Sequence, residues 1–259
     1  MTTEPAPIRP AATILLVRDE PQFEVLMVKR HHQIDFASGA LVFPGGKTHA
    51  GDHDAAWAER SLGWDAFPNI ERELRIAAIR EAYEEAGILL ARDASGEMFR
   101  GDDRAHQARD IIAQDQRPFL DLVRELDLYL DLGCLSAFAR WITPSMMPKR
   151  FDTWFYVARA PEDQLAACDG WETVDSEWIT PNEALRLAAS GERKVIFPTR
   201  MNLQLLAESA NAHEAMTKAI ARPLVTVEPK VERREGGPVL VIPHDAGYGI
   251  VEEPMAALN

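Results

Sequence analysis

Cysteine and basic residues are scarce in this 259-residue sequence, and each shortage excludes a class of protein. Cys134 and Cys168 are its only cysteines, and they are too far apart to suggest a disulfide framework or a cysteine-based metal site. Acidic residues outnumber Lys and Arg by 41 to 28, which gives a net charge of -13. Nucleic acid is therefore not expected as a partner, because its binding depends on Lys and Arg that neutralise phosphates.

Long apolar runs are also missing. No stretch approaches the roughly 18 residues that cross a bilayer, so we expect no membrane partner. The first residues, Met-Thr-Thr-Glu-Pro-Ala-Pro, have neither the basic nor the apolar part of a secretory signal, and a cytoplasmic location is the resulting expectation. Walker, Rossmann and Ser-His-Asp patterns are absent as well, which argues against those nucleotide-binding and hydrolase classes.

The segments that are present mix strands and helices without strict alternation, which favours an α/β sandwich with a mixed sheet over a doubly wound fold. The proline-containing residues 1–10 are expected to be a disordered arm. One domain is predicted over residues 11–222, with helical insertions at about 47–69 and 93–130. Residues 223–259 are predicted to form an extended segment that packs on this domain or on a partner subunit.

A helix predicted over Ile70 to Ala86 carries the residues with the clearest chemistry. At about 100° per residue, Glu81, Glu84 and Glu85 lie on one side of this helix, opposite an apolar side. Like charges at these spacings repel each other, and they lie near a helix C-terminus that disfavours negative charge. A bound Mg²⁺ or Mn²⁺ would reverse both effects. Spacing alone leaves a second interpretation open, in which the three glutamates are simply a solvated face.

The residues around these glutamates resemble a known motif. The run Arg80-Glu81-Ala82-Tyr83-Glu84-Glu85-Ala86-Gly87-Ile88 is similar to the second half of the Nudix box, whose pattern is G-x5-E-x7-R-E-U-x-E-E-x-G-U with U apolar. The run Phe43-Pro44-Gly45-Gly46 resembles the strand and turn that open this box. The resemblance implies a Nudix-type α/β/α sandwich and a hydrolase that cleaves a diphosphate linkage.

Two departures from the pattern accompany the resemblance. Arg80 follows Gly46 by 34 positions where the pattern has fourteen, so about twenty residues are inserted. Counted back from Arg80, the position of the first glutamate holds Arg72, which predicts that one carboxylate is absent or displaced. A long insertion in the box, together with Ala139–Pro144 and Pro148–Thr153, resembles the coenzyme A and acyl-coenzyme A diphosphatases of peroxisomal type and their bacterial relatives.

The resemblance implies a role for several residues. Glu81, Glu84 and Glu85 are expected to bind Mg²⁺ or Mn²⁺ together with the backbone carbonyl of Gly45, and Arg80 is expected to orient a carboxylate. The base that activates water is expected to be one of the box glutamates or a residue of a later loop, with Glu172 as the first candidate. Lys149 and Arg150 are expected to receive a substrate phosphate, although simple surface charge is an alternative for both.

The expected substrate is a small nucleotide-type molecule in which a nucleoside diphosphate is linked to another group, with coenzyme A or an acyl-coenzyme A first. Hydrolysis of ADP-ribose or another ADP-linked compound is the alternative within the same enzyme class. An alternative from another class is a Nudix module that binds a nucleotide as a sensor without turnover. The sequence leaves a homodimer possible, through exchange of the extended C-terminal segment.

Overall fold

The structure is a computed structural model that describes residues 6–30, 39–164, 166 and 173–255. Its centre is a mixed sheet in which the order of strands is β10-β2-β1-β9-β8-β11, with β3 paired to β2 and β4 paired to β1. The pairs β1–β9 and β8–β11 are parallel and the other pairs are antiparallel. The strands are β1 (Ile8–Arg18), β2 (Glu24–Arg30), β3 (Leu41–Val42), β4 (Gly45–Lys47), β8 (Ser136–Ile142), β9 (Arg150–Arg159), β10 (Thr173–Ile179) and β11 (Thr226–Val227).

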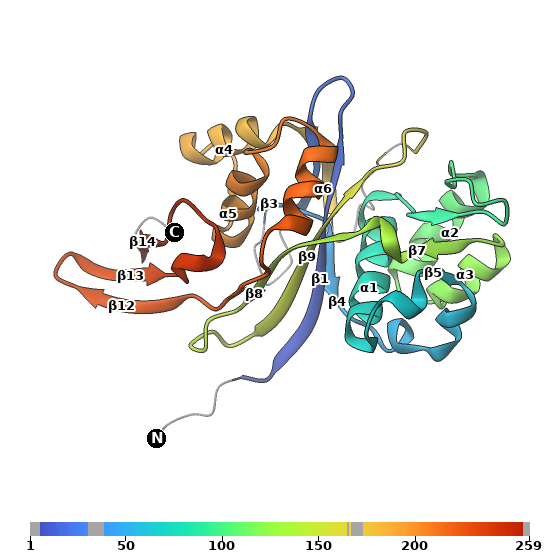
Figure 1. Ribbon diagram of the computed structural model, residues 1–259, viewed down its shortest axis with the longest axis horizontal. Helices are drawn as coiled ribbons and strands as arrows, with labels where there is room; N and C mark the ends of the chain where they lie inside the picture. Colours follow the sequence, from blue (N-terminus) through green and yellow to red (C-terminus); the bar gives the residue numbers. More distant parts are fainter. Residues whose placement is uncertain (1–5, 31–38, 165, 167–172, 256–259) are drawn as a thin grey trace.

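Helices cover both faces of this sheet because its central strand is apolar on both sides. In β1, Ile14 and Leu16 belong to one hydrophobic core, while Leu15 and Val17 belong to the other. The first core contains α1 (Asn69–Ala86), and the second contains residues of α4 (Pro181–Ser190), α5 (Phe197–Leu206) and α6 (Ala212–Ala221). The two groups of helices lie on opposite sides of the sheet in Figure 1. The predicted α/β/α sandwich is thus confirmed.

The first strand begins earlier than the sequence indicated. It starts at Ile8, within the predicted arm 1–10, and pairs with β9 from Ile8 opposite Arg150 onwards. Pro10 belongs to the strand, and its carbonyl accepts a hydrogen bond from the Thr48 backbone N–H at 3.2 Å. Prolines among short polar residues suggested an arm, but the pairing partner lies some 140 residues away in sequence and leaves no local signal. Residues 1–5 lie outside the described residues.

The two predicted insertions form one unit beside α1. The first contains the 3-10 helices η1 (Ala50–His53), η2 (Ala55–Glu59) and η3 (Trp64–Ala66) with β5 (Ser61–Leu62); the second contains α2 (Asp103–Ala113), α3 (Phe119–Glu125) and β7 (Tyr129–Asp131). A small sheet in the order β5-β7-β6 joins them, where β6 is Ala91–Arg92. The 3-10 helix η4 (Leu132–Cys134) then leads into β8. Residues that are 30 to 70 positions apart in sequence are thereby brought together (Figure 1).

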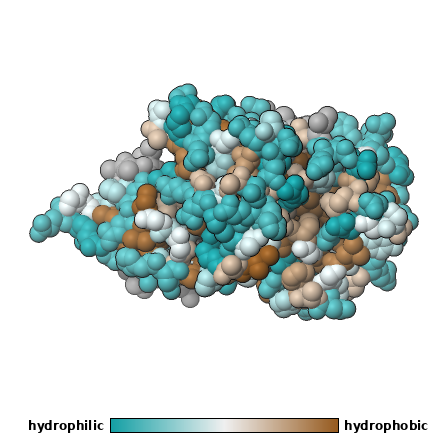
Figure 2. Space-filling view, turned by 45° about the horizontal axis from the view of Figure 1, so that its top comes forward, coloured by the Kyte–Doolittle hydropathy of each residue, from teal (hydrophilic) through white to brown (hydrophobic). Residues whose placement is uncertain are grey.

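The C-terminal segment crosses from the main sheet to a separate sheet. After β11 it forms the sheet β12-β13-β14, from Lys230–Arg234, Gly237–Val241 and Glu252–Pro254, with η5 (His244–Ala246) between β13 and β14. The hairpin of β12 and β13 projects from the body of the molecule, and hydrophilic side chains cover its tip (Figure 2). Tyr248 nevertheless packs in the second core of the same domain. The predicted exchange with a partner subunit stays a prediction.

Among the described residues, no helix combines the length and the apolar character needed to cross a bilayer.

Candidate active site

The catalytic motif lies on the last turns of α1. This helix ends at Gly87, whose φ of 73° is left-handed and whose N–H bonds back to the carbonyls of Ala82 and Tyr83. Within α1, every residue from Leu74 to Ala86 is buried, including Glu81, Glu84 and Glu85. The interpretation of these glutamates as a solvated face is therefore wrong. The sequence pattern could not exclude it, because the groups that cover this face come from the first insertion and from the glycine backbone of β4.

The glycine turn before α1 makes direct contact with two of the glutamates. The Gly45 backbone N–H donates to Glu85 Oε2 at 3.0 Å. A Cβ at Gly46 would lie 2.4 Å from Glu81 Oε1, and a Cβ at Gly45 would lie 2.7 Å from the Ala12 carbonyl. Only glycine lets the turn come this close to both the helix and β1. Glu81 and Glu85 therefore meet the Pro-Gly-Gly turn, whereas Glu84 is bonded to Arg80.

Arg80 is the centre of the charge cluster. Its Nη1 donates to Glu81 Oε1 at 2.9 Å and to Glu84 Oε2 at 2.7 Å. Its Nε and Nη2 donate to the two carboxylate oxygens of Asp52 at 2.9 and 3.1 Å, and Nη2 also donates to the Lys47 carbonyl at 2.9 Å. The guanidinium fixes the carboxylates by charge-assisted hydrogen bonds, as expected for a residue that orients them.

Asp52 is the residue that the sequence analysis missed. It is 2% exposed, and its carboxylate accepts hydrogen bonds from Arg80 and from the His49 backbone N–H. Asp52 lies six positions after Gly46, where the pattern places its first glutamate when counted forward from the glycine. The insertion follows Asp52, so counting backward from Arg80 led to Arg72 instead.

Arg72 has no part in the cluster. Its Nη1 donates to Asn69 Oδ1 at 3.1 Å, and its guanidinium lies 4.6 Å from the centre of the Trp64 ring. Of the two alternatives, an absent or a displaced carboxylate, the structure shows displacement, since Asp52 is bonded to Arg80. A forward count from Gly46 would have found it.

The cluster has an excess of negative charge. Asp52, Glu81 and Glu84 are buried around one guanidinium, and Glu85 is buried beside them against the Gly45 backbone. Burial raises the pKa of Glu84 to about 8, and the charges of Glu81 and Asp52 act in the same direction against Arg80. Burial lowers the pKa of Arg80, but the surrounding carboxylates outweigh it and raise that pKa well above its usual value. A divalent cation would relieve this excess.

The chemistry of these donors fits a hard divalent cation, since all are carboxylate oxygens beside the Gly45 backbone. In this structure Glu81 and Glu84 are bonded to Arg80, and no three His, Cys, Asp or Glu side chains of the described residues form a group that could hold a metal ion. Glu81 and Glu84 would therefore have to change their hydrogen bonds to Arg80, or use their second oxygens, to share an ion with Glu85.

The remaining predicted residues lie elsewhere or outside the described chain. Glu172 lies outside the described residues. Lys149 is exposed in the turn between β8 and β9. The Arg150 side chain is buried, and its guanidinium donates to Glu228 Oε1 at 2.6 Å and to the Thr143 carbonyl at 3.0 Å. These contacts favour a structural role for Arg150, and the phosphate-binding role of both residues stays a prediction.

Comparison with known families agrees with this geometry. A family model described as the NUDT19 Nudix domain matches residues 61–204, which is more than half of the chain. The chain belongs to the Nudix hydrolases of the NUDT19 type. The match begins after Asp52, so the glycine turn and Asp52 are supported by the structure and the box pattern rather than by this model.

Relatives of this Nudix chain support the assignment. It is 27% identical to the human acyl-coenzyme A diphosphatase NUDT19 over 87% of the chain and 72% of that protein. It is 25% identical to the Xenopus laevis protein of the same name over 87% of the chain and 71% of that protein. A Nudix hydrolase structure from Alicyclobacillus acidocaldarius is 29% identical, with a TM-score of 0.71 over 82% of this chain and 96% of that one. The family generally uses divalent metal ions.

Proposed function

We propose that this Nudix hydrolase cleaves the diphosphate of coenzyme A or an acyl-coenzyme A with Mg²⁺ or Mn²⁺. Water would add to one phosphorus and the bridging P–O bond would break, which gives adenosine 3′,5′-bisphosphate and 4′-phosphopantetheine or its acyl form. The observation that carries the proposal is a buried cluster in which Glu81, Glu84 and Asp52 surround Arg80 while Glu85 accepts from the Gly45 N–H. The similarity to proteins named acyl-coenzyme A diphosphatase supports the choice of substrate.

Some residues of the cluster would bind the metal, and others position the ligands. Glu81, Glu84, Glu85 and the Gly45 carbonyl would hold the metal. A bound divalent ion neutralises the diphosphate and lowers the pKa of water. Arg80 holds the carboxylates of Glu81 and Glu84, and the Gly45 N–H holds that of Glu85. Positioning and charge stabilisation are the main requirements of transfer at phosphorus, and a buried, hydrogen-bonded cluster serves both.

A turnover assay tests the proposal. Purified protein is incubated with Mg²⁺ or Mn²⁺ and with coenzyme A, acetyl-coenzyme A or ADP-ribose, and the nucleotide products are separated. The proposal expects metal-dependent release of adenosine 3′,5′-bisphosphate from coenzyme A or its acetyl form. Turnover of ADP-ribose alone would assign the other substrate class. Tight nucleotide binding without any turnover would identify a sensor and contradict the proposal.

A further inference from the structure

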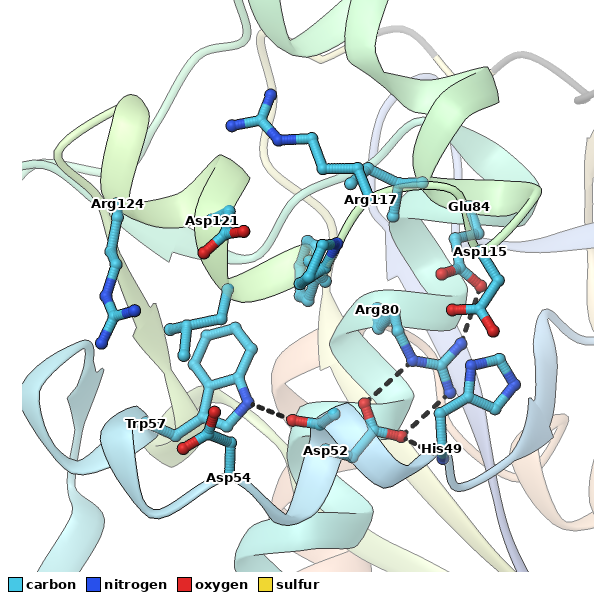
Figure 3. Close-up of a pocket in the computed structure, with 15 residues that line it drawn as sticks. His49, Asp52, Asp54, Trp57, Arg80, Glu84, Asp115, Arg117, Asp121 and Arg124 are labelled. Atoms are coloured by element: carbon cyan, nitrogen blue, oxygen red, sulfur yellow. Dashed lines mark hydrogen bonds and ion pairs between the residues drawn. The ribbon is translucent and has the colours of Figure 1, made fainter.

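A cavity of about 150 Å³ adjoins the carboxylate cluster. Arg80, Glu84 and Asp52 form one of its walls, and the two insertions form the rest (Figure 3). A group in this cavity would therefore be attached to the diphosphate or lie next to it. The small β5-β7-β6 sheet holds the two insertions together, so the cavity exists only because of them.

The floor of the cavity is apolar. Trp57 from η2 and Ile112 from α2 line it, together with Phe119 and Leu120 from α3. All four side chains are buried, and the Trp57 and Phe119 rings pack at a centroid distance of 5.6 Å. A cavity of this volume with an apolar floor accepts a group about the size of benzene, which corresponds to a short branched carbon segment.

The rim of the cavity is acidic. Asp54, Asp115 and Asp121 are exposed at its edge. Arg124 also lines it, whereas Arg117 donates to Glu125 at 2.6 Å and is partly neutralised. Excess negative charge at the rim, beside the buried carboxylates, repels a phosphate group that no metal ion neutralises. The nucleotide end of coenzyme A carries such a phosphate, and its other end does not.

We infer that this cavity binds the neutral, branched carbon segment of the substrate that is attached directly to the diphosphate. The inference rests on the proposed function, and in coenzyme A this segment is the pantoyl part of the pantetheine arm, with its two methyl groups. The substrate then binds in a single orientation, with its diphosphate at the metal-binding carboxylates. Its arm enters the insertion unit, and its adenosine 3′-phosphate points away from the acidic rim.

Filling the cavity tests the inference. Leu120→Phe adds volume to its floor, and Leu126→Phe is the matched control, since Leu126 ends α3 and is buried outside the cavity. In Leu120→Phe, the KM for coenzyme A and the inhibition constant of free pantetheine are each expected to rise about tenfold. The inhibition constant of adenosine 3′,5′-bisphosphate is expected to change by less than about twofold. Leu126→Phe is expected to leave all three values near those of the wild type.

The inference would be overturned if Leu120→Phe and Leu126→Phe changed the inhibition constant of pantetheine equally. It would also be overturned if Leu120→Phe raised the inhibition constants of pantetheine and adenosine 3′,5′-bisphosphate by the same factor. These results differ from failure of the proposed function, in which the wild-type protein itself does not cleave coenzyme A.

If Leu120→Phe does not fold, a charge reversal at the rim tests which end of the substrate lies at the cavity. Asp121 is exposed, so Asp121→Arg is compatible with the fold. With the arm in the cavity, inhibition by adenosine 3′,5′-bisphosphate is expected to change by less than about twofold, because the nucleotide lies at the other end. Inhibition that becomes about tenfold stronger would place the nucleotide phosphate at this rim and overturn the inference.

Discussion

At the scale of single residues, Arg80 and Asp52 hold the active site together. Arg80 uses its guanidinium nitrogens on three carboxylates and one carbonyl, and Asp52 receives two of these hydrogen bonds while it caps η1 through the His49 N–H. Loss of one partner from a buried ion pair leaves an uncompensated charge, which costs more free energy than the pair itself contributes.

Asp52→Ala is therefore expected to lower the free energy of unfolding by about 3 kcal/mol. Turnover is expected to fall as well, because Arg80 then shifts its hydrogen bonds among the glutamates. Urea denaturation followed by circular dichroism measures the first effect. Asp65→Ala, at an exposed aspartate of the same insertion, is the control, and an equal loss in both variants would contradict the role of Asp52.

Glu84 gives a prediction about pH. Its pKa of about 8 lies above the ordinary value of 4.5, so the folded protein binds this proton more tightly than the unfolded chain does. Without metal, the contribution of Glu84 to stability is therefore present below pH 4.5 and is lost as the pH rises towards 8. Melting curves in EDTA between pH 5 and 8 should show a decline for the wild type relative to Glu84→Gln. Parallel curves would contradict this prediction.

At the scale of elements, the second insertion supports the end of α1. Arg109 from α2 donates to the Glu84 carbonyl at 2.9 Å and packs against Gly87, and the Tyr83 hydroxyl donates to the Ala105 carbonyl. A cation near the C-terminus of a helix is favourable to its dipole. The insertion thus positions the helix whose glutamates are expected to bind the metal.

Arg109→Met is expected to weaken Mn²⁺ activation about tenfold, because outer contacts of this kind orient metal ligands. The constant for half-maximal activation by Mn²⁺ measures the effect. Arg104→Met, on the exposed side of α2 where Arg104 pairs with Asp102, serves as the control. If both variants have the same activation constant as the wild type, Arg109 has no positioning role.

Local signals predicted the elements well. Helix α1 begins one residue before the predicted Ile70 and ends at the predicted Ala86, because its apolar periodicity and Gly87 act over a few residues. The start of β1 was missed because its partner β9 is distant in sequence. Asp52 was missed because an insertion of about twenty residues separates it from Arg80, and the cavity was missed because it needs two insertions to meet.

At the scale of the whole molecule, the C-terminal segment is tied to the main domain through Tyr248. Its hydroxyl accepts a hydrogen bond from Trp141 Nε1 at 2.9 Å and donates one to Asn202 Oδ1 at 2.8 Å. These three residues come from the segment, β8 and α5, and all are buried. The segment is thus part of the same packed unit as the second core.

Tyr248→Phe is expected to lower the free energy of unfolding by about 1–3 kcal/mol, since it leaves a buried donor and a buried acceptor without their partner. Metal-dependent turnover is expected to stay at the wild-type level, because Tyr248 packs in the core opposite the one that contains α1. Urea denaturation measures the free energy of unfolding, and a turnover assay on the same preparation measures the activity. A large loss of turnover with unchanged stability would contradict this account.

The central claim is that the buried glutamates of α1 bind the metal that hydrolysis needs. The most direct measurement is calorimetric Mn²⁺ binding to the double variant Glu84→Gln/Glu85→Gln, with coenzyme A turnover on the same samples. Glu73→Gln is the control, since Glu73 lies on α1 and pairs with His53 outside the cluster. The account predicts loss of both Mn²⁺ binding and turnover in the double variant alone; retention of both would contradict it.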